Sequence, residues 1–168
     1  ECIKDIGYEQ DGFHWENCDI QNYLHQQSSD IAMGVDSSNN KDDGAGDQGI
    51  MFGFACKDTE ELMPAPIYYS HQILIKMASA RKSKKITELE PDSKSQITML
   101  YENGKPSKVM SVVISTQHKP NLSPGQIKEI VRPFVYNSIP QNLIQDLKDE
   151  EFYVNPTGNF VIGGPHGD

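Results

Sequence analysis

Three short segments of this 168-residue chain combine glycine with charged side chains in patterns that suit ligand binding. In the first, residues 43–49, three glycines surround Asp47. Glycine lets a backbone take positive φ and approach a ligand closely. Asp47 could accept from a substrate ammonium group or bind a cation. These residues alone favour a functional loop and a merely flexible loop equally.

The second segment, residues 91–95, places an acid and a base two positions apart, Asp92 and Lys94. Side chains two apart in a strand lie on one face of it. Lys94 could contact a phosphate or a charge that develops in a transition state, and Asp92 could hold a hydroxyl or an amine. Taken alone, a solvated pair at the start of a strand is the better interpretation.

The third segment, residues 155–168, is dense in glycine and proline and carries Phe160 and Asp168. Phe160 could stack on a base, and Asp168 could bind an amine. The segment is neither a GxGxxG dinucleotide fingerprint nor a GxxxxGK[ST] phosphate loop. A plain turn between domains is the alternative.

Composition excludes several classes of protein. The net charge of -9 and the lack of a basic stripe argue against nucleic-acid binding, and no apolar run approaches the ~20 residues of a membrane span. Three cysteines without CxxC spacing favour a reducing compartment over a disulfide framework. The five histidines lack HxH or HxxxH spacing, so a zinc site is not indicated.

The elements that must position these segments follow from the apolar pattern. Residues 50–56 predict a buried strand, and residues 67–82 predict a helix that begins at Pro66. The predicted buried stripe of this helix includes a histidine that we expect to be a hydrogen-bonded core residue; the stripe comprises Ile67, His71, Leu74, Ile75 and Ala78.

A hairpin and a second helix follow. Strands are expected at 95–101 and 109–116, joined by a turn at Asn103 and Gly104. Ser123 and Gln126 form a capping box that opens a helix. Its buried stripe is expected to comprise Ile127, Ile130, Val131, Phe134 and Val135. With a last strand at 151–154, the order is β-α-β-β-α-β, an α+β fold with a mixed, mostly antiparallel sheet and helices on one face.

The first part of the chain is less regular. Residues 1–8 suggest the end of a helix with Gly7 as its C-cap, and residues 15–23 fit a strand or a helix equally. Residues 28–46 form a long polar stretch, which we expect to be a mobile lid and a boundary. Both ends of the chain suggest a piece of a longer protein.

Five segments in this order resemble S-adenosylmethionine synthetase, also called methionine adenosyltransferase: GAGDQGIMFGFA at 44–55, LMPAP at 62–66, PDSKSQ at 91–96, STQH at 115–118 and NPTGNFVIGGPHGD at 155–168. The resemblance covers essentially the whole chain. It implies one of three similar α+β domains, and four parts: residues 1–28 from the end of the N-terminal domain, a mobile gating loop or linker at 29–43, the central domain at 44–161, and the truncated start of the C-terminal domain at 162–168.

The resemblance implies a transferase of one-carbon metabolism, in which the methionine sulfur attacks C5′ of ATP and S-adenosylmethionine forms with release of phosphate and pyrophosphate. The family uses two Mg²⁺ ions and one K⁺ ion. Their ligands are expected outside this chain, which lacks the family's opening Gly-His-Pro-Asp-Lys, so no metal ligand is assigned here. A cytoplasmic homodimer or homotetramer with active sites between subunits is expected, without nucleic-acid or membrane partners.

Site residues carry over by position. Lys94 is the expected catalytic residue. The expected ATP-binding residues are Asp92, Ser93, Lys94, Asn159, Phe160 and Asp168. The expected methionine-binding residues are Gln27, Asp47 and Asp168, with Gln27 at the start of the gating loop. Position 159 departs from the family, which has a cation there. The 168 residues alone are expected to be inactive. The alternative is a folded, non-catalytic assembly or nucleotide-binding module.

Overall fold

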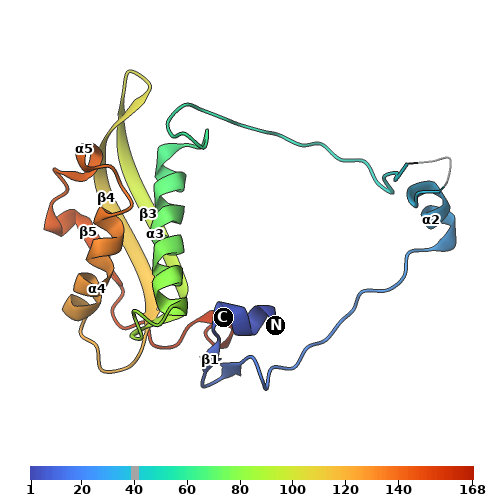
Figure 1. The fold of residues 1–168 in the computed structure, drawn as a ribbon, viewed down its shortest axis with the longest axis horizontal. Coiled ribbons are helices and arrows are strands. Elements are labelled where there is room, and N and C mark those ends of the chain that lie inside the picture. Colours follow the sequence, from blue (N-terminus) through green and yellow to red (C-terminus); the bar gives the residue numbers. More distant parts are fainter. Residues whose placement is uncertain (39–41) are drawn as a thin grey trace. The chain divides into compact units, whose positions relative to one another are not determined.

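The computed structural model describes residues 1–38 and 42–168, and these form two units. Unit 1 comprises residues 1–18 and 55–168, and unit 2 comprises residues 19–54. Unit 1 holds the predicted α+β arrangement, in which helices cover one face of a mixed sheet (Figure 1). No helix of the described residues is long and apolar enough to cross a membrane.

The sheet of unit 1 has the strand order β3-β4-β5. Strand β3 (Leu89–Glu102) pairs antiparallel with β4 (Lys105–His118), and β5 (Phe152–Val154) pairs parallel with β4. The predicted turn between β3 and β4 is confirmed, because Asn103 and Gly104 both have positive φ, 51° and 73°. Two-residue hairpin turns of this kind match the twist of the strands they join.

Two helices, α3 (Ala65–Lys82) and α4 (Pro124–Tyr136), pack on the sheet (Figure 1). The capping box of Ser123 and Gln126 is present at the start of α4, as predicted. The predicted stripe of α4 is confirmed as well: Ile127, Val131 and Val135 are buried, and Ile130 and Phe134 pack beside them. A short helix, α5 (Gln141–Ile144), and a turn of 3₁₀-helix, η1 (Asp149–Glu151), lead into β5.

The predicted stripe of α3 is wrong at most of its positions, although Leu74 packs against the core as predicted. Ile67 is 44% exposed and Ile75 is 57% exposed, and His71 is exposed rather than a core residue. The side of α3 that enters the core instead comprises Ala65, Tyr69, Ile73 and Met77. Both rows have the four-residue spacing of a helix face. The spacing therefore predicts a helix but does not decide which row faces the sheet.

The strand predicted at 50–56 is also absent from the structure, so the order in unit 1 lacks its first strand. The four large apolar side chains of the segment, Ile50, Met51, Phe52 and Phe54, are 77% to 94% exposed. Backbone groups of a strand need a neighbouring strand as hydrogen-bond partner. No described strand runs beside residues 50–54, so their apolar character does not make them a strand here.

The N-terminal part of unit 1 begins with α1 (Cys2–Ile6), which ends at Gly7 with a φ of 98°, so the predicted C-cap is confirmed. Strands β1 (Glu9–Gln10) and β2 (Phe13–His14) then form a small antiparallel pair. The undecided stretch at 15–23 begins with a turn and has no further helix or strand.

Unit 2 contains α2 (Ser29–Val35), so part of the stretch predicted as a loop is helical. Residues 39–41 of the predicted linker lie outside the described residues. The predicted domain boundaries remain a prediction.

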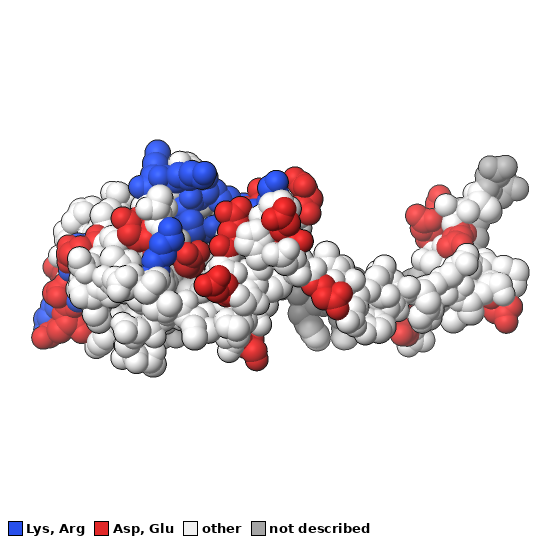
Figure 2. All heavy atoms as spheres, turned by 90° about the horizontal axis from the view of Figure 1, so that it is seen from below, with Lys and Arg blue, Asp and Glu red and all other residues white. Residues whose placement is uncertain are grey.

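Lysine and arginine side chains gather on one part of the surface of unit 1 (Figure 2). A hollow of about 570 Å³ in this unit has a mixed but mainly basic lining of charged residues: Lys4, Asp5, Glu9, Arg81, Lys82, Lys84, Glu90 and Lys119. Several of these charges are already engaged. Lys82 forms an ion pair with Asp5 at 2.8 Å, and the Arg81 guanidinium donates to the Ile6 carbonyl at 2.7 Å. The hollow is therefore partly a structural contact between α1 and the end of α3.

Candidate functional site

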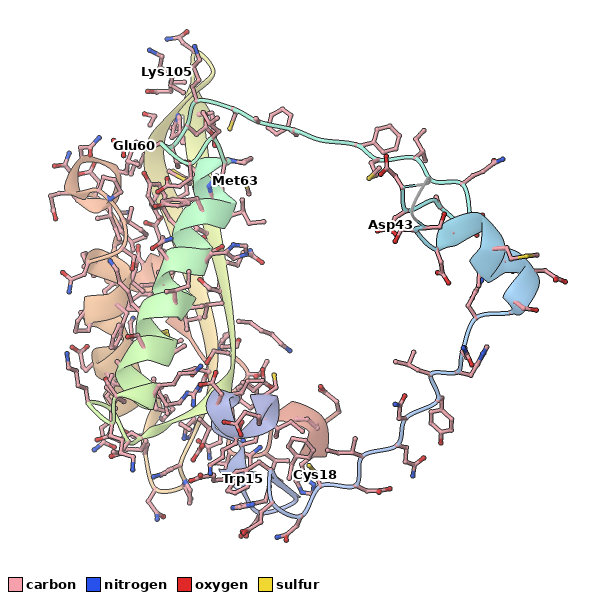
Figure 3. All side chains as sticks on the ribbon, turned by 45° about the vertical axis from the view of Figure 1, so that its right-hand side comes forward. Trp15, Cys18, Asp43, Glu60, Met63 and Lys105 are labelled. Carbon is pink, nitrogen blue, oxygen red and sulfur yellow. The ribbon has the colours of Figure 1, made fainter. Side chains whose placement is uncertain are left out.

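The start of β3 and the end of β4 form one end of the sheet, because the two strands are antiparallel and pair Ser93 with Thr116. The hairpin tip at Lys105 lies at the other end, away from Trp15 (Figure 3). The glycine- and proline-rich segment that follows β5 crosses the first end. Two of the three segments singled out from the sequence are therefore brought together there.

Asn155 fixes the start of this crossing. Its side-chain carbonyl accepts from the Thr116 N–H at 2.8 Å, and its amide donates to the Thr116 carbonyl at 3.0 Å. The side chain thus pairs with the backbone N–H and carbonyl of β4 as a neighbouring strand would. The backbone of Asn155 itself has a positive φ of 46°. The Thr116 hydroxyl lies 2.7 Å from the Ser93 hydroxyl, so the position of Ser93 depends on the same clamp.

Residues 160–163 are held by the end of β4. The His118 N–H donates to the Phe160 carbonyl at 2.9 Å, and the Phe160 N–H donates to Nε2 of His118 at 3.1 Å. Gln117 donates to the Val161 carbonyl at 2.9 Å and to the side-chain oxygen of Gln10 at 2.6 Å. Gln10 in turn donates to the Gly163 carbonyl at 3.2 Å. Four side-chain or backbone donors therefore fix the path of this loop.

Asp92 joins the second segment to the third. Its carboxylate accepts from the Gly164 N–H at 3.0 Å. Burial raises the pKa of the nearby Tyr8 hydroxyl, and the negative charges of Asp92 and Asp168 raise it further, while Arg81 opposes them. Asp92 and Asp168 consequently act on one phenol and lie at the same end of the sheet.

Gly164 can lie close to both Asp92 and Tyr8 because it has no side chain. It begins a turn of 3₁₀-helix, η2 (Gly164–His166), with a φ of 63°. A Cβ placed at Gly164 would lie 2.7 Å from Cε1 of Tyr8. Any other residue would thus combine an unfavourable backbone conformation with a collision. The backbone N–H can therefore reach Asp92 only with glycine here.

Lys94 occupies the face of the sheet that α3 and α4 leave uncovered. Ile97 and Val112 pair across the strands and are buried in the core, and alternation along β3 turns Lys94 to the opposite face. The side chain is exposed. A register shift between Leu89 and Ser93 interrupts the alternation at Asp92, so the predicted shared face of Asp92 and Lys94 does not follow from spacing alone.

The remaining predicted residues do not all enter this site. Asn159 is exposed. Gln27 and Asp47 belong to unit 2, where both are exposed and Asp47 accepts from the Gln48 N–H at 2.7 Å. In that unit the first glycine-rich segment folds against the end of α2, because the Gly44 N–H donates to the Val35 carbonyl at 2.7 Å.

Metal binding finds no support in the described residues, which contain no group of three or more histidine, cysteine, aspartate or glutamate side chains that could hold an ion.

Sequence reasoning missed the residues that build the loop's support, namely Tyr8, Gln10, Gln117, His118 and Asn155. Only Gln117, His118 and Asn155 lie in segments that resemble the family, namely STQH at 115–118 and the start of the segment at 155–168. The sequence carries no comparable indication for Tyr8 and Gln10.

Comparison with known proteins identifies the class. The sequence model of the S-adenosylmethionine synthetase central domain matches residues 42–160. S-adenosylmethionine synthases of Pelagibacter ubique and Maricaulis maris are 63% and 62% identical to the chain, and that of Rhodospirillum centenum is 54% identical over 99% of it. The chain spans about 43% of the length of the first two relatives and 42% of the third. Residues 42–160 therefore correspond to the central domain of this family. The chain belongs to the S-adenosylmethionine synthetase family.

Proposed function

We propose that this chain is part of a methionine adenosyltransferase, which forms S-adenosylmethionine from ATP and L-methionine and releases phosphate and pyrophosphate. The observation that carries the proposal is the hydrogen bond between Asp92 and the Gly164 N–H, 3.0 Å long. It joins two of the segments by which the chain resembles the family, although they lie 72 residues apart. The names of the similar proteins support the same activity.

ATP would bind at the end of the sheet where these segments meet. Phe160 is half-buried and offers its ring to the adenine, while Asp92, Ser93 and Asp168 offer groups for the amine and hydroxyls of the nucleoside. Asn159 is neutral and would contribute a hydrogen bond rather than a charge to ATP.

Lys94 would act on the leaving group. When the methionine sulfur attacks C5′, negative charge builds on the tripolyphosphate that departs. The exposed ammonium of Lys94 would stabilise that charge in the transition state, which is the kind of interaction that accelerates the chemical step.

Methionine would be held by Gln27, Asp47 and Asp168. Gln27 and Asp47 offer an amide and a carboxylate for the amino-acid head group, and Asp168 is shared with the nucleoside. Residues 27–36 would form the gate over the substrates, with α2 as its ordered part.

The proposal includes a cytoplasmic homodimer or homotetramer, with the uncovered sheet face near Lys94 turned toward another subunit. It also includes two Mg²⁺ ions and one K⁺ ion. No residue of this chain is assigned a metal-ligand role.

The test measures S-adenosylmethionine formation from ATP, methionine and Mg²⁺ by the complete natural protein. We expect Lys94→Ala to lower kcat by about 10²- to 10³-fold, as loss of one preorganised charge at a transition state does. Lys105→Ala, at the hairpin tip, is the matched control and should leave kcat unchanged. A Lys94→Ala enzyme with near-normal kcat would contradict the proposed role. The 168 residues alone should yield no product.

A further inference from the structure

We infer that His118 is a positioning residue, which sets the backbone of Phe160 and thereby the ring that meets the nucleotide. The inference rests on the proposed function, because it concerns the residue that would contact ATP. His118 closes β4 and is 1% exposed, so its imidazole is enclosed by protein rather than by water. It acts through Phe160, to which it is hydrogen-bonded.

Two hydrogen bonds join these residues in a ring. The His118 N–H donates to the Phe160 carbonyl at 2.9 Å, and the Phe160 N–H donates to Nε2 of His118 at 3.1 Å. Both backbone polar groups of Phe160 are therefore held by one residue. A loop residue fixed at its N–H and at its carbonyl has little freedom to rotate its backbone.

The tautomer of His118 follows from its partners. Nδ1 lies 2.8 Å from the carbonyl oxygen of Lys119, which can only accept, so Nδ1 must carry a proton. Nε2 faces the N–H of Phe160, which can only donate, so Nε2 must offer its lone pair. The site thus specifies a neutral ring with one defined tautomer.

The ring of Phe160 is fixed from the other side by Gly163. A Cβ at Gly163 would lie 2.5 Å from Cε2 of Phe160, so the aromatic ring lies directly against this glycine. Backbone and ring are then both set before a ligand arrives. Groups held in the bound geometry lose less entropy on binding, so the arrangement should favour nucleotide affinity.

The test uses two substitutions in the complete natural protein, each of which keeps one of the two hydrogen-bonding atoms of the His118 ring. His118→Gln can place its side-chain oxygen near the position of Nε2 and keep an acceptor for Phe160. His118→Asn is shorter and can keep a donor to Lys119 while it loses that acceptor. We expect His118→Asn to raise the KM for ATP roughly tenfold, the effect of one lost hydrogen bond, with the KM for methionine unchanged. His118→Gln should restore the KM for ATP to within about threefold of the natural value.

Four outcomes separate the inference from the function on which it rests. If His118→Asn changes the KM values for ATP and methionine equally, His118 is only a structural residue and the inference is overturned. The same holds if His118→Asn and His118→Gln lose equal thermal stability without a change in the KM for ATP. Phe160→Ala provides the independent arm. If Phe160→Ala leaves the KM for ATP unchanged, the proposed contact of Phe160 with ATP is wrong. If Phe160→Ala raises it and His118→Asn does not, only the positioning role is wrong.

Discussion

Replacement of Asn155 by alanine is the sharpest test of how the candidate site is built. The change removes a side chain that is 4% exposed and that pairs with both backbone groups of Thr116. Thr116 has no exposed surface, and these two groups point away from β3. Without Asn155 they would be buried without a partner.

The expected cost follows from these contacts. Each orphaned buried group costs about 1 to 3 kcal/mol, and an alanine at a φ of 46° adds about 1 kcal/mol of backbone strain. The backbone around position 155 can shift and reduce part of this cost, because Asn155 follows a strand of only three residues. We therefore expect Asn155→Ala to lower the free energy of unfolding by about 3 to 5 kcal/mol. Asn155→Gly should lose about 1 kcal/mol less, because glycine accepts the backbone conformation.

Urea unfolding followed by circular dichroism measures this loss. The midpoint should fall while the slope of the free energy against urea concentration stays the same, since the fold is unchanged. Asn159→Ala, four residues further on, is the control, and as an exposed substitution it should change stability by less than about 0.5 kcal/mol. A loss below about 1 kcal/mol for Asn155→Ala would refute the view that this side chain replaces a strand.

Two further predictions concern other parts of unit 1. Gly163→Ala should displace the ring of Phe160, whose Cε2 would lie 2.5 Å from the new Cβ, and raise the KM for ATP without a matching loss of stability; an unchanged KM would contradict the packing. Burial, with the hydrogen bond to Asp58, raises the pKa of Tyr101 to about 12. The folded state then keeps a proton that the unfolded state loses from pH 10 upward, so stability is intact below pH 10 and falls toward pH 12. In Tyr101→Phe, the free energy of unfolding, measured with urea at pH values from 10 to 12, should fall less steeply with pH. An equal fall in both proteins would show that Tyr101 is not the group responsible.

Local signals in the sequence predicted local structure well. The hairpin turn at Asn103 and Gly104, the capping box at Ser123 and the C-cap at Gly7 are confirmed because each is decided within four residues. The stripe of α4 is confirmed because its apolar residues occupy a single face.

Predictions that depend on distant partners fared less well. The core row of α3 was wrong because apolar residues occur around most of the helix, so spacing does not single out the face that meets the sheet. The strand at 50–56 was wrong because a strand exists only beside another strand. Helix α2 was missed because its seven residues are too few to show a helical period in the sequence.

The residues of the candidate site also fall into those that the sequence indicated and those that it did not. Glycine and acid segments identified Asp92, Phe160 and Asp168, because their chemistry is visible in the residue types. Nothing in the sequence indicated Tyr8 or Gln10, since their role depends on contacts with residues more than 70 positions away. The predicted roles of Gln27 and Asp47 stay predictions.

The exposed apolar run from Ile50 to Phe54 has a consequence for handling the chain in solution. Its five residues contain no charge and no proline, and their large side chains face water. Such segments pair edge to edge with copies of themselves and seed intermolecular β-structure. Concentrated samples of these 168 residues should therefore self-associate through this run, and a lysine in place of Phe52 should act as a gatekeeper that raises solubility.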